Sequence, residues 1–393
     1  MFYLDTSAAA QSPASHGVPR VTRRLYEALR QFGPVAPLVW SRRHHTFCPL
    51  STSEWRFLEQ PFAQHSGPLL NPRAMRRRPR YAFERWLHQR RTALPFDQLC
   101  QPGNTLLMPD PCDDDRVAWI QRAANDGRLR MMAIFHDAIP YLRPDLTPWF
   151  RLTGYEDYLR CLSRFHTVVS CSEESRDALI GIWRRLGCAP APVIVEPWPT
   201  DLGPRGQSDP MRFDRPRVLY VSSLDPRKNH LMLFAACERL WSEGSHFELE
   251  LIGRQLPDSS VSKPVIEAIR RLQRGGRPVQ WQGHVSDDAL VAAYQQCSFT
   301  VYPSLIEGFG LPIHESLWFG RPCVCGTNGA LGEVSAGGGC LACDQTQVDS
   351  LADAMRRLLT DRALYMKLSE EAAQRPFRSW EDYGRALQRH LEE

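Results

Sequence analysis

Short apolar runs alternate with amphipathic segments along much of this sequence, most regularly after residue 216. Strands are expected there at Arg217–Ser223, Phe247–Ile252, Val279–Gln282, Phe299–Tyr302 and Cys323–Cys325. Helices are expected at Asn229–Ser242, Val261–Arg274, Asp287–Gln296, Leu311–Phe319, Val348–Leu359 and Arg362–Glu371. A chain that alternates in this way is predicted to be α/β, with helices covering both faces of a parallel sheet.

The residues before 196 repeat the alternation less regularly, and residues 41–104 show only weak periodicity. The expected strands are Met1–Asp5, Thr105–Met108, Met131–Phe135 and Thr167–Ser170. The expected helices are Pro19–Gln31, Arg116–Asn125, Tyr155–Arg164 and Glu173–Leu186. Five prolines and two glycines between residues 196 and 216 are typical of a linker. The 393 residues therefore divide into predicted domains at 1–200 and 201–376, followed by a C-terminal helix at 377–393.

Composition excludes several classes of protein. Hydrophobic residues make up 43% and charged residues 23% of the chain, which excludes a disordered chain, a collagen-like fibre and a coiled coil. No apolar run approaches the ~18 residues of a transmembrane helix, and the first twenty residues lack the basic start of a secretory leader. We therefore expect a cytoplasmic protein. A net charge of +4 is too small to indicate nucleic acid binding.

The segment from Ser222 to His230 reads S-S-L-D-P-R-K-N-H and joins a predicted buried strand to a predicted helix, with Asn229 as the expected N-cap. Arg227 and Lys228 stand just before the helix N-terminus, where the helix dipole disfavours cations. An anion between these cations and the helix amides would offset that cost, and a diphosphate fits. Lysine is also rare here, with three among 48 basic residues. A solvated surface turn is the alternative explanation.

A second segment, from Glu307 to Glu315, reads E-G-F-G-L-P-I-H-E and follows another apolar strand. Gly308 and Gly310 permit unusual backbone angles and close approach of a ligand, and Pro312 suits the first turn of a helix. The loop amides and the helix terminus would form a second group of N–H donors. Glu307 and Glu315 would accept hydrogen bonds from sugar hydroxyls. For Glu315, expected in the first turn, partnership with the helix dipole is the competing explanation.

Two groups of residues have the character of metal ligands. One forms C-x-C and C-x-x-C pairs from Cys323, Cys325, Cys340 and Cys343. The C-x-C pair lies in a predicted strand, where buried reduced cysteines act as small apolar residues. The other has a D-x-D spacing at residues 113–115, but it precedes a predicted helix and is expected to cap it. We predict no metal site and no cofactor.

Together the motifs resemble those of retaining glycosyltransferase family 4, the group 1 type. The resemblance rests on the E-x7-E pattern of Glu307 and Glu315 with its G-F-G-L-P core, and on D-P-R-K-N-H at 225–230. It is strong over 217–385 and weaker before. It implies the GT-B fold, in which two Rossmann-like parallel-sheet domains face a central cleft. The first domain would bind the acceptor and the second the nucleotide sugar, and residues 377–393 would cross back to the first domain.

The resemblance also implies roles for the matching residues. Arg227 and Lys228 would neutralise the diphosphate of the nucleotide-sugar donor, and Glu315 would hold its ribose. Glu307 and the amides after it would hold the transferred sugar and the adjacent phosphate. His136, at the carboxyl end of a predicted strand, would contact the sugar near the reacting carbon, although a hydrogen-bonded structural histidine is the alternative. The other expected donor-binding positions are Gly17, Ser223, Gly253, His284, Val285, Gly308, Phe309, Gly310 and Leu311.

The reaction implied by the resemblance moves a hexose, with mannose or a related deoxy-hexose favoured, from a nucleotide-diphosphate sugar such as GDP-mannose. The acceptor would be a hydroxyl of a glycan or lipid-linked molecule, as in bacterial polysaccharide and lipopolysaccharide synthesis. Transfer would retain the configuration and need no metal ion. The alternatives are a sugar-nucleotide epimerase or another nucleotide-sugar enzyme on the same fold, and a non-catalytic binding protein.

A basic and aromatic segment extends from Arg73 to Arg91. It holds eight arginines beside Tyr81, Phe83 and Trp86. Interleaved basic and aromatic side chains suit the surface of an anionic membrane, so we predict a peripheral contact at the inner face of the membrane. A solvated loop is the alternative. We expect no nucleic acid partner, because no nucleic-acid-binding module appears in the sequence.

Overall fold

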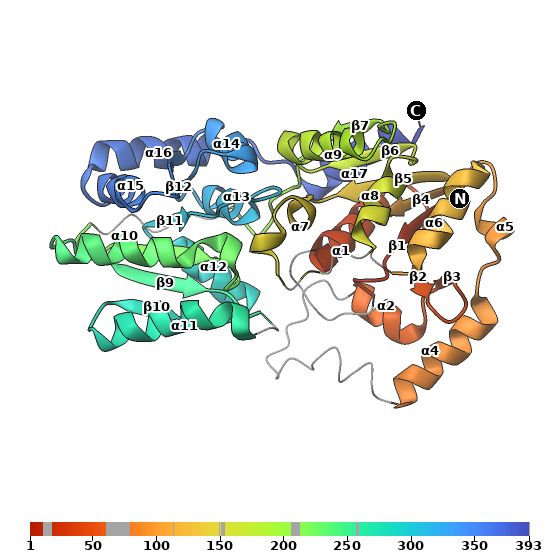
Figure 1. The fold of residues 1–393 in the computed structure, drawn as a ribbon, viewed down its shortest axis with the longest axis horizontal. Coiled ribbons are helices and arrows are strands. Elements are labelled where there is room, and N and C mark those ends of the chain that lie inside the picture. Colours follow the sequence, from red (N-terminus) through yellow and green to blue (C-terminus); the bar gives the residue numbers. More distant parts are fainter. Residues whose placement is uncertain are drawn as a thin grey trace. The chain divides into compact units, whose positions relative to one another are not determined.

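The computed structural model describes residues 1–10, 18–59, 79–112, 114–148, 150, 154–205, 213–256 and 259–392. The chain forms two compact units (Figure 1). The first unit comprises Met1–Tyr141, Arg151–Trp198 and Ser379–Glu393, and the second comprises Leu142–Phe150 and Pro199–Arg378. The sequence predicted that the chain passes from the first domain to the second after residue 200 and returns to the first after residue 376. It did not assign the short segment Leu142–Phe150 to the second unit.

The first unit is built on a seven-stranded sheet with the strand order β3-β2-β1-β4-β5-β6-β7. Its strands are β1 (Phe2–Asp5), β2 (Val35–Ser41), β3 (Thr46–Pro49), β4 (Thr105–Met108), β5 (Arg130–Phe135), β6 (Thr167–Ser170) and β7 (Val193–Val195). All neighbouring strands are parallel except β2 and β3, which run antiparallel at one edge. The predicted parallel sheet is thus confirmed apart from this edge.

Helices cover the sheet of the first unit (Figure 1). They are α1 (Val18–Leu29), α2 (Thr52–Glu59), α4 (Pro79–Thr92), α5 (Phe96–Leu99), α6 (Arg116–Asp126), α7 (Ile139–Leu142), α8 (Tyr155–Leu162), α9 (Glu173–Arg185) and α17 (Trp380–Glu392). Helix α17 packs against α1 so closely that a Cβ atom on Gly384 would meet the Ala28 Cβ at 3.1 Å. Tyr383 and Leu387 of α17 are fully buried in the same core as Leu4 of β1.

The second unit is built on six parallel strands in the order β10-β9-β8-β11-β12-β13. The strands are β8 (Arg217–Val221), β9 (Glu248–Ile252), β10 (Val279–Trp281), β11 (Phe299–Tyr302), β12 (Cys323–Gly326) and β13 (Cys340–Cys343). This is the strand order of a dinucleotide-binding sheet, and the order reverses between β8 and β11. Ligands of open parallel sheets bind beyond the carboxyl ends of the strands at such a reversal.

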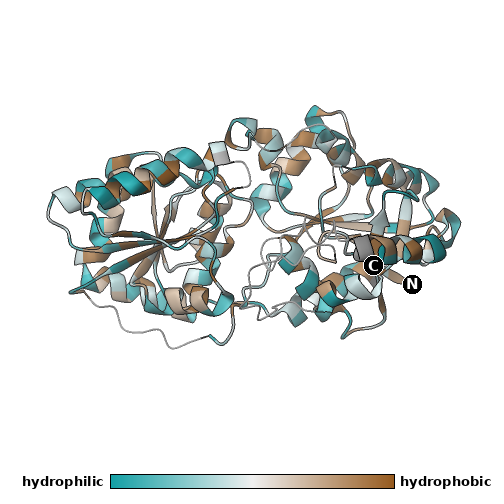
Figure 2. Ribbon diagram, turned by 90° about the horizontal axis from the view of Figure 1, so that it is seen from below, coloured by the Kyte–Doolittle hydropathy of each residue, from teal (hydrophilic) through white to brown (hydrophobic). Residues whose placement is uncertain are grey.

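The helical segments of the second unit are η1 (Pro144–Leu146), η2 (Pro226–Lys228), α10 (His230–Ser242), α11 (Ser259–Arg274), α12 (Asp287–Gln296), α13 (Leu311–Trp318), α14 (Gly329–Ala336), α15 (Val348–Thr360) and α16 (Arg362–Gln374). Figure 2 shows apolar strands between helices of mixed hydropathy, as expected for helices that turn one apolar face to a sheet. Val218, Phe234, Val301 and Leu317 are among the buried residues of this core.

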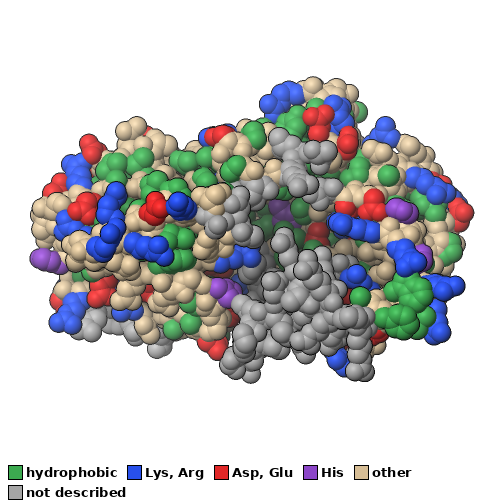
Figure 3. Space-filling view, turned by 60° about the horizontal axis from the view of Figure 1, so that its bottom comes forward, with side chains coloured by type: hydrophobic (Ala, Val, Ile, Leu, Met, Phe, Trp, Pro, Cys, Tyr) green, Lys and Arg blue, Asp and Glu red, His purple; other side chains and the backbone are tan. Residues whose placement is uncertain are grey.

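Charged side chains of both signs are spread over the face shown in Figure 3. This distribution agrees with the small net charge of the chain. Within the part of the chain that the structure describes, no helix is both long enough and apolar enough to cross a lipid bilayer.

Candidate functional site

The two predicted loops meet in the second unit, at the reversal of strand order. The loop that ends in η2 follows β8, and the loop that begins with Pro303 follows its neighbour β11. Leu305 N donates a hydrogen bond of 2.8 Å to the Arg227 carbonyl. Asn229 Nδ2 donates one of 3.1 Å to the Pro303 carbonyl. The topology therefore brings Arg227, Lys228 and Glu307 to one place, where a Rossmann-like sheet binds its ligand.

Lys228 is the centre of this cluster. Its Nζ lies 2.5 Å from Glu307 Oε1 and donates a hydrogen bond of 2.7 Å to the hydroxyl of Tyr302. That hydroxyl in turn donates to Glu307 Oε1 over 3.1 Å. Only 10% of the Lys228 side chain and 9% of the Glu307 side chain are exposed. The alternative of a solvated surface turn is wrong for Lys228.

The charge of Glu307 is maintained by its neighbours. Burial alone would raise the pKa of Glu307, but Lys228 and Arg227 together lower it below its ordinary value. Glu307 is therefore ionised at neutral pH. An ammonium group has three N–H donors, and the hydrogen bonds of Lys228 within the described residues use two of them. One donor remains for an anionic ligand.

Arg227 is held by Asp225, the N-cap of η2. The Asp225 carboxylate accepts from the Arg227 backbone N at 2.8 Å and from its guanidinium at 3.0–3.2 Å. The Arg227 side chain is 21% exposed. Both cations of the loop thus have a carboxylate partner within the second unit, which fixes their side chains before any ligand binds.

The predicted side-chain cap at Asn229 is wrong. Asn229 does occupy the N-cap position of α10, but it has a φ of 56° and its side chain makes no capping bond. Its amide instead donates to the carbonyls of Pro303 and Gln345, at 3.1 and 2.9 Å. Asparagine tolerates this left-handed conformation better than most residues. Asn229 therefore links the two loops.

Glu315 does not lie in the first turn of α13, so the prediction of a first-turn dipole partner is wrong. It is the fifth residue of a helix that begins at Leu311, and it is 5% exposed. Its Oε2 accepts a hydrogen bond of 2.9 Å from the Tyr294 hydroxyl. The first turn carries His314, which stacks on Phe309 with ring centroids 4.4 Å apart. Burial, with Arg375 as a further cause, lowers the pKa of His314 to about 3.

The other predicted positions differ in their surroundings. Gly253 follows β9, and a Cβ atom there would lie 1.7 Å from the Ser222 carbonyl oxygen. This close approach gives Gly253 a structural reason to be glycine. Gly310 precedes α13 with a φ of 86°, as expected. Ser223 and Val285 are half-buried, His284 is exposed, and Gly308 and Phe309 are buried in the loop after β11. Gly17 lies outside the described residues.

His136 belongs to the first unit, directly after β5 as predicted. Its Nε2 lies 2.6 Å from the Pro109 carbonyl, so this nitrogen carries the proton and donates. Its Nδ1 is buried and has no hydrogen-bond partner among the described residues. Burial lowers the pKa of His136, so the ring stays neutral. The ring packs on Trp198 at a centroid distance of 5.0 Å.

The structure adds polar residues that the sequence did not indicate. Asp110 follows β4 and accepts hydrogen bonds from Thr22 Oγ1 at 3.0 Å and from Ala8 N at 3.2 Å. Asp5 ends β1 and pairs with Arg116 at 2.9 Å. Both carboxylates are almost fully buried at the carboxyl edge of the first sheet. The available signal was an aspartate at the end of an apolar strand, for Asp5, or two residues after one, for Asp110.

The cysteine and aspartate groups do not form a metal site where the structure describes them. Cys323 of β12 lies opposite Cys340 of β13 in the sheet register, and both cysteines are free. Cys343 lies three residues after Cys340, so it points to the other face of its strand. Among the described residues, no group of three or more His, Cys, Asp or Glu side chains could hold a metal ion. Asp113 of the D-x-D group lies outside these residues, and Asp114 accepts from Arg116 N at 3.1 Å.

Comparison with known proteins shows which family the second unit resembles. Residues 208–375 match the sequence model described as glycosyl transferases group 1. The second unit is therefore similar to the group 1 glycosyltransferases over nearly its whole length. The chain is also similar to the O-antigen chain mannosyltransferase B of Escherichia coli, with 29% identity over 268 residues, 64% of this chain and 68% of that protein. A 101-residue stretch is 33% identical to the serotype-specific mannosyltransferase WbdA of the same species and covers 12% of it.

Solved structures confirm the predicted GT-B fold of the chain. The sucrose-phosphate synthase of Thermosynechococcus elongatus superimposes with a TM-score of 0.68 at 17% identity, covering 100% of this chain and 98% of that one. Anabaena HepE in complex with UDP and glucose gives a TM-score of 0.67 at 17% identity, with 100% and 99% coverage. At this level of identity the likeness concerns the fold alone.

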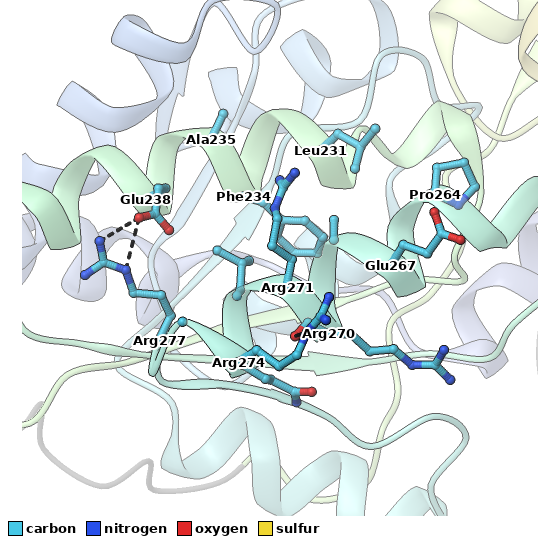
Figure 4. Close-up of a pocket in the computed structure, with 14 residues that line it drawn as sticks. Leu231, Phe234, Ala235, Glu238, Pro264, Glu267, Arg270, Arg271, Arg274 and Arg277 are labelled. Atoms are coloured by element: carbon cyan, nitrogen blue, oxygen red, sulfur yellow. Dashed lines mark hydrogen bonds and ion pairs between the residues drawn. The ribbon is translucent and has the colours of Figure 1, made fainter.

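The second unit also has a groove between α10 and α11 (Figure 4). It contains none of the predicted donor-binding residues. Arg277 points across it and bonds to Glu238 Oε1, as the dashed lines in Figure 4 show. Arg270 and Arg271 are among its lining residues.

The predicted membrane segment is described only in part, because residues 60–78 and the side chains of residues 79–81 lie outside the described part. In α4 of the first unit, Phe83 is 61% exposed and lies 5.5 Å from Trp86. The guanidinium groups of Arg43 and Arg90 lie over the Trp86 ring at 5.4 and 5.7 Å. The helix thus combines exposed aromatic and basic groups, and the membrane contact stays a prediction.

Proposed function

We propose that the protein transfers a hexose from a nucleoside diphosphate sugar to a hydroxyl of a glycan or lipid-linked acceptor, with retained configuration, in the synthesis of a bacterial surface polysaccharide. We favour mannose as the sugar. The observation that carries the proposal is the buried cluster of Lys228, Tyr302 and Glu307 at the reversal of strand order, which leaves one ammonium donor for an anion. The similarity to a mannosyltransferase of O-antigen synthesis supports the choice of sugar and product.

The proposed chemistry follows from where charge develops. Breaking the bond between sugar and diphosphate places negative charge on the departing phosphate, so groups fixed before the reaction stabilise the transition state best. Lys228 and Arg227 are fixed by Glu307 and Asp225, and the backbone N–H of Leu311, the first residue of α13, would add a further donor. These groups would stabilise the leaving diphosphate without a metal ion.

The acceptor hydroxyl must lose a proton as it attacks. In the retaining reaction that we propose, an oxygen of the departing phosphate takes this proton on the face from which the diphosphate leaves. His136 would contact the sugar through its neutral ring and its backbone. The lowered pKa of His136 argues against a role as a proton donor at neutral pH. Glu307 would accept hydrogen bonds from the sugar hydroxyls.

A transfer assay tests the proposal. The full chain is incubated with radiolabelled GDP-mannose or UDP-glucose and a bacterial membrane lipid extract, with and without EDTA. We expect label to move to the lipid or glycan fraction from GDP-mannose, and EDTA to have no effect. The anomeric configuration of the product, measured by NMR, tests retention. Release of an epimerised nucleotide sugar without transfer would favour the epimerase instead.

A further inference from the structure

Two tyrosines on neighbouring strands bind the two ends of Lys228. Tyr220, on β8, donates its hydroxyl hydrogen bond to the backbone carbonyl of Lys228. Tyr302, the last residue of β11, accepts from the Lys228 ammonium at 2.7 Å and donates to Glu307 at 3.1 Å. The two rings meet edge to face with centroids 5.8 Å apart. One tyrosine is therefore bound to the backbone of the lysine and the other to its charge.

The hydroxyl groups of both tyrosines form hydrogen bonds with Lys228. Both side chains are at most 2% exposed. A phenylalanine would supply the same ring to the core, and a buried hydroxyl is unfavourable unless it is hydrogen-bonded. A free lysine side chain has many conformations, and restricting it costs conformational entropy. The hydrogen bond from Tyr220 fixes the backbone at Lys228, and the hydrogen bond with Tyr302 restricts the lysine side chain before a ligand arrives.

We propose that Tyr302 and Tyr220 are positioning residues that hold Lys228 so that its remaining ammonium donor meets the diphosphate of the donor substrate. This inference rests on the proposed function. In this proposal neither tyrosine touches the donor substrate itself. Their effect on ligand binding is therefore expected to pass through Lys228 alone.

A double-mutant cycle tests this dependence. Binding of GDP and UDP to the full chain is measured by calorimetry for wild type, Tyr302→Phe, Lys228→Ala and the double variant. Loss of a hydrogen bond to a charged group should weaken diphosphate binding by Tyr302→Phe by about tenfold or more. In the Lys228→Ala background the same change should have almost no effect, because coupled residues are not additive.

The pH dependence gives a second readout. Tyr302→Phe removes a hydrogen bond to the Glu307 carboxylate, so the pKa of Glu307 should rise. Any change in diphosphate affinity that accompanies protonation of Glu307 should then occur at a higher pH than in wild type. Tyr365→Phe is the matched control, because Tyr365 is a buried tyrosine whose hydroxyl donates to the Ser298 carbonyl at 2.8 Å. It should leave both affinity and pH dependence unchanged.

The outcomes separate the two levels of inference. Wild-type affinity in Tyr302→Phe, or an equal loss in the Lys228→Ala background, overturns the positioning role while the proposed function stands. If wild type binds neither GDP nor UDP, the proposed function itself fails. Circular dichroism checks the fold of each variant. If Tyr302→Phe does not fold, Tyr220→Phe enters the same cycle, where the same dependence on Lys228 is expected.

Discussion

Lys228 Nζ lies 2.5 Å from Glu307 Oε1, and both side chains are about nine-tenths buried. Removing one partner of such a pair leaves the other charge buried and unpaired, which typically costs about 3–5 kcal/mol. Two effects therefore overlap in any single substitution at this pair: loss of a group that would contact substrate, and loss of stability. The first prediction separates them.

Lys228→Met should abolish transfer and lower the free energy of unfolding. Adding Glu307→Gln should restore much of the stability, because no buried charge is then left unpaired, while activity stays at least about 100-fold below wild type. Urea unfolding and the transfer assay measure the two effects. Lys263→Met is the matched control. The Lys263 side chain is 74% exposed, and its Nζ lies 3.8 Å from Glu267 Oε1, so this ion pair is in contact with solvent and weak. Full activity in the double variant would contradict the assignment.

Asp110 predicts a pH dependence of stability. Burial, followed by the charge of Asp5, raises the pKa of Asp110 from 3.8 to about 7. Between these values the folded state binds a proton that the unfolded state lacks, so stability should fall as pH rises from about 4 to about 7 and level off above. Asp110→Asn should flatten this slope in urea unfolding, whereas Asp97→Asn, with a 78% exposed side chain, should not. An unchanged slope in Asp110→Asn would show that Asp110 titrates normally.

A side chain at position 253 should disturb the loop before η2. Gly253→Ala places a Cβ atom 1.7 Å from the Ser222 carbonyl oxygen, so the backbone must shift. We expect a loss of stability of a few kcal/mol, within the range for strained or overpacked sites, and weaker binding of nucleoside diphosphate. Gly181→Ala in α9 is the control, because nothing lies within 4 Å of its Cβ. It should stabilise the protein by about 0.5–1 kcal/mol. A thermal melt that shows no difference between the two would contradict the close approach.

Substitution of His136 should impair transfer without affecting the fold of the second unit. His136→Ala should lower kcat by about 100-fold, in the range seen for lost transition-state contacts, and leave the affinity for nucleoside diphosphate near wild type. His166→Ala is the matched control in the same unit, because His166 Nδ1 accepts from Met131 N at 3.1 Å, at the amino end of β5. It should retain transfer. Equal kcat losses in both variants would indicate a structural role for His136.

The second unit was largely predictable because its strands and helices differ clearly in period. Phe299–Tyr302 and Asp287–Gln296 were predicted with the bounds that the structure has. In the first unit, β2 was missed because Pro37 lies within it, and proline argues against an inner strand. Helix α14 was missed because it begins at Gly329 and contains Gly332, and glycine disfavours helices.

The candidate site was predictable as two loops but not as a cluster. Lys228 and Glu307 are 79 residues apart, and only the pairing of β8 with β11 brings them together. The sequence could not distinguish Tyr302 from an ordinary core tyrosine, since strands commonly hold buried aromatic residues. It also placed Glu315 in the wrong turn of α13, because the start of a helix is harder to locate than the helix itself.

Helix α17 places Tyr383 and Leu387 in the core of the first unit, although the whole of the second unit precedes them in the chain. During synthesis the second unit can therefore be complete while the first still lacks part of its interior. The earliest-made half of the protein would finish folding last, and a ribosome that stalls before residue 380 would leave Leu4 and Ala28 without their final covering.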